Sequence, residues 1–88
     1  EEPGDPDVHF YLGVARLLEN RPRDAARSLQ TAVRLAPASS VYRWHLIQAL
    51  LRTGDRRTVL RELNILAAGI DEYSAQARQL RARIYAGN

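Results

Sequence analysis

Apolar side chains recur at helical spacing in five stretches of the chain, separated by short polar segments that contain proline, glycine or asparagine. Residues spaced three and four apart lie on one face of an α-helix, so this pattern predicts amphipathic helices. The predicted helices cover residues 7–20, 22–36, 41–53, 56–68 and 72–86. No stretch of the sequence shows the period-two alternation of a half-buried strand. The predicted fold class is therefore all-α, with about five helices.

Residues at the ends of these stretches are typical of helix boundaries. Three stretches follow short polar side chains that can accept a hydrogen bond from a first-turn N–H: Asp5 or Asp7, Ser39 or Ser40, and Asp55. Asn20 and Gly54 tolerate the left-handed conformation that often follows a helix. Pro22 suits a first turn. Pro37 and Gly69 are expected to end the second and fourth helices.

The sequence partly overlays itself when it is shifted by 34 residues. The identical pairs are Leu12 with Leu46, Ala15 with Ala49, Leu17 with Leu51, Arg23 with Arg57, Arg27 with Arg61, and Leu29 with Leu63. A single pair of helices cannot bury both of its apolar faces, so successive pairs are expected to stack. The predicted inter-helix core consists of Leu12, Ala15, Leu29, Leu46, Ala49 and Leu63.

This 34-residue period, together with the residues that separate the helices, resembles the tetratricopeptide repeat. In residues 6–39 the family's pattern falls on Leu12-Gly13, Ala25, Ala32 and Pro37, with Leu29 where the family favours an aromatic residue. Gly13, Ala25 and Ala32 are small enough to let the first two helices approach closely. In residues 40–73 the match is weaker, because Leu46 and Gly54 fit but Asp71 replaces the proline.

The resemblance implies antiparallel helix pairs stacked as a short right-handed α-solenoid over residues 7–88, with residues 74–86 as a closing helix. Residues 1–6, rich in acid, proline and glycine, are expected to form a linker. In such stacks the first helix of each pair lines a concave groove. The groove residues implied here are Phe10, Val14, Leu17, Val41, Trp44, Gln48, Leu51, Arg52, Arg78, Ala82 and Tyr85.

Aromatic residues and arginine are enriched at interface hot spots, so a peptide or a partner helix is expected to dock in this groove. The alternative is that Phe10, Leu17 and Trp44 complete the core of a short array. Some members of the family hold a C-terminal carboxylate with Lys and Asn side chains. The matching positions here are Phe10, Val14, His45, Ala75 and Gln79, so that ligand is not expected. Arg52 and Arg78 are candidates to hold an acidic side chain instead.

All 13 basic residues are arginine, and the formal net charge is +3. Arginine binds carboxylate and phosphate groups bidentately, although a GC-rich genome also favours this residue. Arg23, Arg27, Arg57 and Arg61 would align on the convex face of the stack as a candidate anion-binding set, called here the arginine ladder. Asp24 and Glu62 interrupt the ladder, which favours a solvated surface over binding of nucleic acid.

The composition argues against several other classes. The 88 residues include no Cys, which excludes disulfides and thiolate chemistry, and no apolar run long enough to span a membrane. His9 and His45 are too few for a metal site without a third ligand, and neither has a nucleophile beside it, so no metal, cofactor or catalytic residue is expected. The absence of Met indicates an excerpt or a processed product, and the Ala, Leu and Arg usage favours a module of a larger bacterial protein. The compartment is not indicated.

The sequence therefore predicts a non-catalytic scaffold that binds another protein or peptide. Self-association is the alternative, because a short array ends on an exposed apolar face unless its last helix is polar outward. The last stretch is only partly polar, through Gln76, Gln79, Arg81 and Arg83. Tyr73 and Tyr85 are expected to remain exposed.

Overall fold

The computed structural model describes residues 4–87, which form five α-helices. These are α1 (Pro6–Leu18), α2 (Pro22–Leu35), α3 (Ser40–Thr53), α4 (Arg56–Ala67) and α5 (Glu72–Ala86). No strand occurs between residues 4 and 87, so the predicted all-α class is confirmed. Residues 1–3 of the predicted linker and residue 88 of the predicted domain lie outside the described residues. None of the described helices has the length and apolarity needed to cross a membrane.

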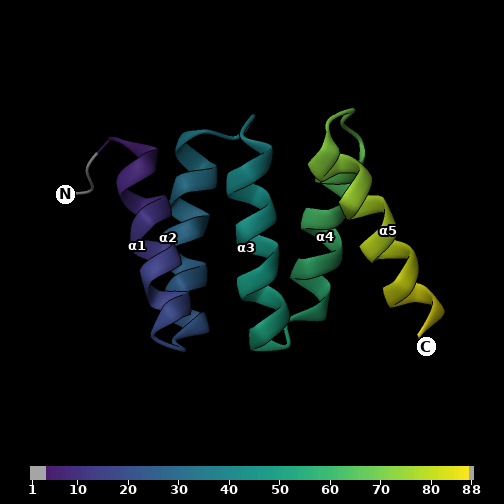
Figure 1. Cartoon of the computed structure of the whole chain (residues 1–88), viewed down its shortest axis with the longest axis horizontal. Helices are drawn as coiled ribbons and strands as arrows, with labels where there is room; N and C mark the ends of the chain where they lie inside the picture. Colours follow the sequence, from purple (N-terminus) through teal and green to yellow (C-terminus); the bar gives the residue numbers. More distant parts are fainter. Residues whose placement is uncertain (1–3, 88) are drawn as a thin grey trace.

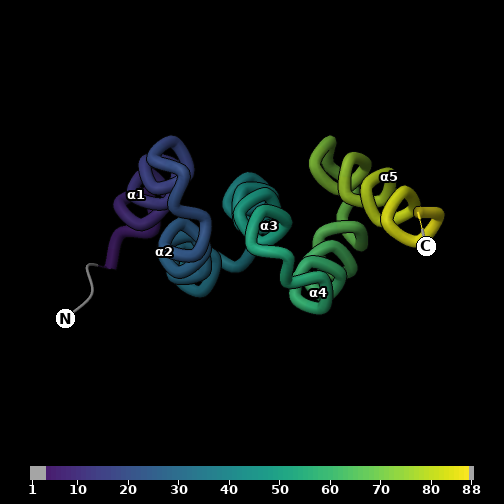
Figure 2. The backbone as a smooth tube through the Cα atoms, turned by 90° about the horizontal axis from the view of Figure 1, so that it is seen from below, coloured from purple at the N-terminus to yellow at the C-terminus, as the bar shows by residue number. Residues whose placement is uncertain are grey.

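The five helices run in alternating directions and form two layers. Figure 1 shows them side by side in chain order, and Figure 2 shows α1, α3 and α5 in one layer and α2 and α4 in the other. We call these the odd layer and the even layer. Each helix packs against the next one in sequence, with smaller contacts between α1 and α3 and between α3 and α5. The resulting molecule is elongated, with extents of 41 × 27 × 18 Å.

Side-chain caps begin four of the helices. Asp5, Ser39, Asp55 and Asp71 each accept a hydrogen bond from a first-turn backbone N–H of α1, α3, α4 and α5, respectively. The caps at Asp5, Ser39 and Asp55 agree with the candidates predicted from the sequence, whereas the cap at Asp71 is not among them. α2 begins instead at Pro22, which has no N–H to satisfy. Asn20 and Gly54 have positive φ angles of 61° and 81°, which confirms the predicted left-handed turns.

The core lies mainly on α2, α3 and α4. Its largest fully buried apolar side chains are Leu29, Leu46, Ile47, Val59 and Leu63. Ala25, Ala32 and Ala49 are also completely buried, so small side chains bring the helices together along much of the interface. Four of the six predicted core residues lie in this region: Leu29, Leu46, Ala49 and Leu63.

The prediction that Leu12 and Ala15 are core residues is wrong. Leu12 is 40% exposed, and Ala15 is also exposed. Their repeat equivalents Leu46 and Ala49 are buried because α3 packs against the preceding helix, α2. α1 is the first helix of residues 4–87, so no described helix precedes it to cover the same face.

α1 packs closely against α2 at Gly13, its buried residue. A Cβ atom at this position would lie 2.5 Å from Leu29 Cγ and 3.3 Å from the carbonyl oxygen of Ala25. Contacts this short are far inside van der Waals distance, so any larger residue would displace α1 or Leu29. The prediction that small residues let the first two helices approach closely is confirmed here.

A buried ion pair joins α3 to α4. Arg43 Nη1 donates to Glu62 Oε1 at 2.5 Å, and Arg43 Nη2 donates to the Pro37 carbonyl oxygen at 3.0 Å. Only 10% of the Arg43 side chain and 9% of the Glu62 side chain are exposed. The guanidinium therefore holds the α2–α3 loop and α4 together through charge-assisted hydrogen bonds.

Candidate functional site

The predicted groove residues all lie on the odd-numbered helices (Figure 2). Each is half-buried or exposed, and none belongs to the fully buried core. α1 contributes Phe10, Val14 and Leu17, α3 contributes Val41, Trp44, Gln48, Leu51 and Arg52, and α5 contributes Arg78, Ala82 and Tyr85. We call this set the odd-layer strip. It crosses three helices and retains accessible apolar and aromatic surface.

Phe10 lies in an aromatic cluster that joins α1 to α3. Its ring stacks on Tyr42 with centroids 4.9 Å apart and meets His45 edge-on at 5.0 Å. His45 Nδ1 lies 2.9 Å from the Val41 carbonyl oxygen. Phe10 therefore contributes to helix packing in addition to the accessible surface, and His45 is held within α3 by a local contact.

Trp44 lies in a second aromatic cluster, toward α5. Its ring centroid is 6.5 Å from that of Tyr73, and both side chains pack partly buried against the core. Tyr73 is thus half-buried, contrary to the prediction that it remains exposed, because it covers the α3 face beside Trp44. Tyr85, near the end of α5, is 55% exposed as predicted.

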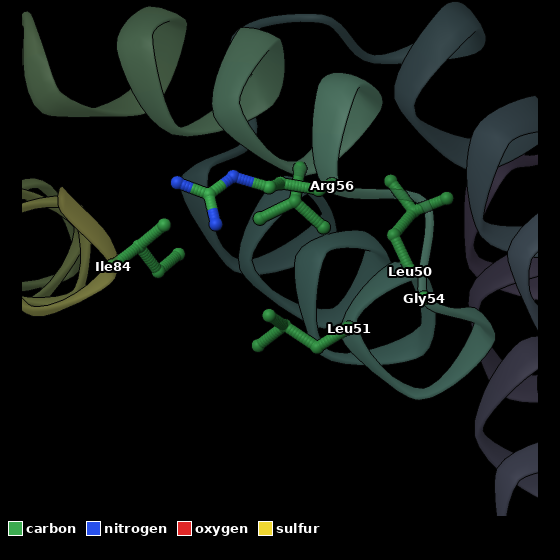
Figure 3. A pocket seen from close by; sticks show the side chains of 6 residues that line it. Leu50, Leu51, Gly54, Arg56 and Ile84 are labelled. Carbon is green, nitrogen blue, oxygen red and sulfur yellow. The ribbon is translucent and has the colours of Figure 1, made fainter. Parts of the chain in front are cut away.

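Leu51 lines a cavity of about 240 Å³ between α3, α4 and α5 (Figure 3). The other lining residues are Leu50, Gly54, Arg56, Val59 and Ile84. Of these lining residues, only Leu51 is predicted from the sequence to belong to a binding surface. The others come from three different helices and a turn, so their meeting depends on how α5 sits against α3 and α4.

Arg52 and Arg78, the candidates for an acidic ligand, donate hydrogen bonds to the ends of other helices. Arg52 Nη1 donates to the Leu17 carbonyl oxygen at 3.3 Å, and its Nη2 donates to the Asn20 side chain. Arg78 Nη1 donates to the carbonyl oxygens of Ala67 and Gly69 at 2.8 and 3.1 Å. Positive charge at a helix C-terminus is stabilising because the carbonyl dipoles point there.

The arginine ladder lies on the even layer, where all four side chains are exposed. Arg27 Nη1 lies 3.4 Å from Asp24 Oδ1, and Arg61 Nε lies 3.5 Å from Glu62 Oε2. These acids neutralise part of the charge that an anionic ligand would need.

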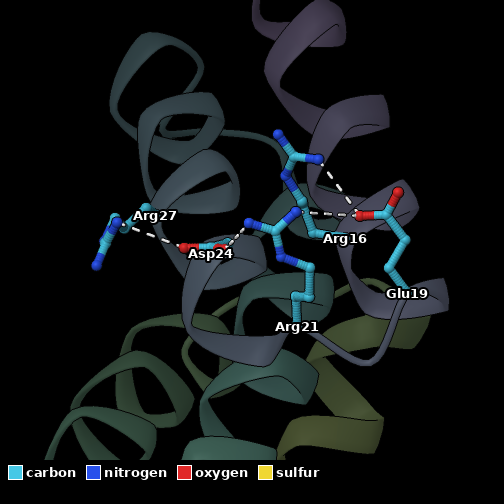
Figure 4. Close-up of polar contacts among 5 residues, drawn as sticks. All are labelled: Arg16, Glu19, Arg21, Asp24 and Arg27. Carbon is cyan, nitrogen blue, oxygen red and sulfur yellow. Dashed lines mark hydrogen bonds and ion pairs between the residues drawn. The ribbon is translucent and has the colours of Figure 1, made fainter.

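Near the α1–α2 turn the surface charges alternate in sign (Figure 4). Glu19 Oε1 lies 3.3 Å from Arg16 and 3.6 Å from Arg21, and Arg21 Nη2 lies 2.5 Å from Asp24. Exposed pairs of this kind typically contribute about 0.2–1 kcal/mol each. The positive and negative side chains on this surface therefore pair with one another.

Two capping carboxylates have lowered pKa values. Hydrogen bonds from the Thr58 side chain and backbone lower the pKa of Asp55, with a smaller effect from Arg61 and Arg57. For Asp71, the Ser40 hydroxyl donates at 2.5 Å and is the largest cause of the lowered pKa, followed by the Ser74 backbone N–H. Both carboxylates therefore accept hydrogen bonds that stabilise the start of a helix.

Among the residues that the structure describes, no three His, Asp or Glu side chains come close enough to hold a metal ion. Comparison with known proteins gives no match to a family model, a curated protein or a solved structure. Function is therefore inferred from the residues and their geometry.

Proposed function

We propose that this chain is a protein-interaction module, built as a short right-handed α-solenoid of the tetratricopeptide type. It binds a peptide or a partner helix along the odd-layer strip. The observation that carries the proposal is the position of the strip: accessible apolar and aromatic side chains follow one layer across α1, α3 and α5. The 34-residue period and the alternating helix directions support the array.

The chemistry of the strip suits docking. Leu51 and Tyr85 are 39% and 55% exposed, and Trp44 keeps part of its ring surface accessible. Large aromatic and apolar anchors are the side chains that contribute most to peptide and helix recognition. The core beneath is already closed by alanine and leucine side chains, so these residues have surface left for a partner.

Binding of a peptide selected from a random library against the folded chain tests the proposal. Trp44→Ala and Tyr85→Ala are each expected to weaken binding by about tenfold or more, as measured by calorimetry. Leu18→Ala is the control, because Leu18 is 84% exposed and lies outside the strip. If both strip variants keep the parent's affinity while circular dichroism shows them folded, the odd-layer strip is not the binding site.

The outer face of α1 supports self-association as a second candidate function. Val8, Tyr11 and Leu12 on this helix are 48%, 67% and 40% exposed. The repeat equivalent of Leu12 is Leu46, which is buried against the preceding helix. A cluster of exposed apolar side chains at a position that is covered elsewhere in the same chain is typical of a contact surface.

Sedimentation velocity tests this second candidate. The parent chain is expected to show a concentration-dependent dimer, and Leu12→Glu is expected to be monomeric because a charge would be buried in the contact. Ile70→Glu is the matched control, since Ile70 is fully exposed in the α4–α5 turn. A parent that stays monomeric at all concentrations contradicts self-association.

A further inference from the structure

We infer that the cavity beside Leu51 binds a large apolar side chain flanked by a carboxylate, presented by an acidic peptide segment. The inference deepens the proposed function and rests on it in taking the ligand to be a peptide. Residues of α3, α4 and α5 line the cavity, and Figure 1 shows α5 running away from α4 toward its C-terminal end. Figure 3 shows the Arg56 side chain extending from the start of α4 toward Ile84 on α5, with Leu51 projecting into the same space.

A difference between the α1–α3 seam and the α3–α5 seam accounts for the space at this cavity. Between α1 and α3, Arg52 closes the seam by donating to the Leu17 carbonyl oxygen and to the Asn20 side chain. A shift of 34 residues replaces Arg52 by Ala86 and Asn20 by Gly54. Neither replacement has a side chain that can bridge two helices. The seam between α3 and α5 therefore lacks the hydrogen bonds that join α1 to α3 and leaves a space at the same end of the helices.

The cavity walls are mostly aliphatic. Leu50, Leu51, Val59 and Ile84 supply the apolar surface, and Gly54 adds no side chain. The volume of about 240 Å³ exceeds the roughly 150 Å³ of an apolar cavity that holds a benzene ring. A phenyl or isobutyl group therefore fits, and burying it removes apolar surface from water on both partners.

Arg56 is the charged group on the cavity wall, and none of the six lining residues is acidic. A guanidinium carries five N–H donors, so Arg56 can bind a ligand carboxylate in addition to a partner within the chain. Its planar geometry suits bidentate binding of a carboxylate. Charge complementarity thus favours an acidic neighbour beside the apolar group.

Titration with 4-phenylbutyrate and its neutral analogue 4-phenylbutanamide tests the inference. Both place a phenyl ring near a polar end, but only the first is charged. We expect 4-phenylbutyrate to shift the methyl NMR signals of Leu51 and Ile84 and to bind about tenfold more tightly than the amide. Arg56→Gln is expected to abolish this difference. Arg57→Gln is the matched control, because it removes the same charge one residue along the helix and outside the cavity.

Three results would overturn the inference: methyl signals that do not move, equal affinity for the acid and the amide, or equal effects of Arg56→Gln and Arg57→Gln. Failure of the proposed function has a different signature. In that case 4-phenylbutyrate still binds beside Leu51, whereas Trp44→Ala and Tyr85→Ala leave the affinity for the selected peptide unchanged. Tyr85 and Trp44 do not line the cavity, so their variants report on the part of the odd-layer strip that lies outside it.

Discussion

Gly13 is the residue at which helix propensity and packing oppose each other most directly. Alanine is favoured over glycine inside a helix by about 0.5–1 kcal/mol. At Gly13, however, an added Cβ would lie 2.5 Å from Leu29 Cγ, and Leu29 is fully buried. Overpacking of this kind costs about 1–3 kcal/mol. We expect Gly13→Ala to lower the free energy of unfolding by about 1 kcal/mol, as measured by urea denaturation.

The same substitution made together with Leu29→Ala isolates the contact. In that background the added methyl group has room, so Gly13→Ala is expected to be neutral or stabilising. A stabilised Gly13→Ala in the otherwise unchanged chain contradicts the close approach of α1 and α2.

At the scale of one residue pair, Arg43 and Glu62 form the interaction whose disruption has the largest expected effect. Glu62→Ala leaves a buried guanidinium without its acid, which costs about 3–5 kcal/mol. Replacing both partners by Arg43→Met and Glu62→Leu is expected to cost less, because no buried charge then remains unpaired. Chemical denaturation of the two variants measures which of them loses more stability. A double variant that loses as much stability as Glu62→Ala, or more, would contradict a penalty for the unpaired guanidinium.

At the scale of the element, the N-terminal caps connect helices as well as start them. Asp71 caps α5 through the Ser74 N–H and also accepts a hydrogen bond from Ser40 at the start of α3. The lowered pKa values of Asp55 and Asp71 mean that the folded chain favours their charged forms. This stabilisation is fully present above the unfolded pKa, near the usual value of 3.8, and is lost as pH falls through the lower folded value.

We therefore expect the free energy of unfolding to fall as the pH is lowered from about 5 to below the unfolded carboxyl pKa of about 4. Asp55→Asn and Asp71→Asn keep a side chain able to cap a helix but cannot titrate. In the double variant the free energy of unfolding should depend less steeply on pH. Thermal unfolding at several pH values measures this dependence. Identical pH profiles for the parent and the double variant would show that these caps do not carry the effect.

The helices were predictable to within two residues because their boundaries depend on local chemistry: Asp5, Asn20 and Gly54 act on the backbone beside them. Contacts across helices were not predictable in the same way. Arg52 reaches Leu17 and Asn20 only because two helix ends meet, and no sequence signal gives that placement. Helical spacing and stacking predict Leu12 in the core, although its burial also depends on which helix precedes α1.

The same distinction applies to the candidate site. The odd-layer strip follows from the 34-residue period, because that period decides which helices share a layer. The cavity beside Leu51 depends instead on the divergence of α5 from α3 and on two side chains missing from the α3–α5 seam, where Ala86 and Gly54 stand at the positions equivalent to Arg52 and Asn20. A comparison of equivalent positions shows that these two side chains are missing. The sequence alone does not show that a space forms where they are missing.

At the scale of the whole molecule, each helix is held mainly by its neighbours in sequence. α5 packs against α4 and α3, no described helix follows it, and its only fully buried residues are Ser74 and Ala77. In an architecture with nearest-neighbour contacts, a terminal element can detach without unfolding the rest. Transient opening of α5 would carry Tyr85 and Ile84 away from α3 and dismantle part of the binding surface. A ligand that contacts α3 and α5 together would therefore stabilise the docked position of α5. It would slow backbone amide hydrogen exchange in that helix.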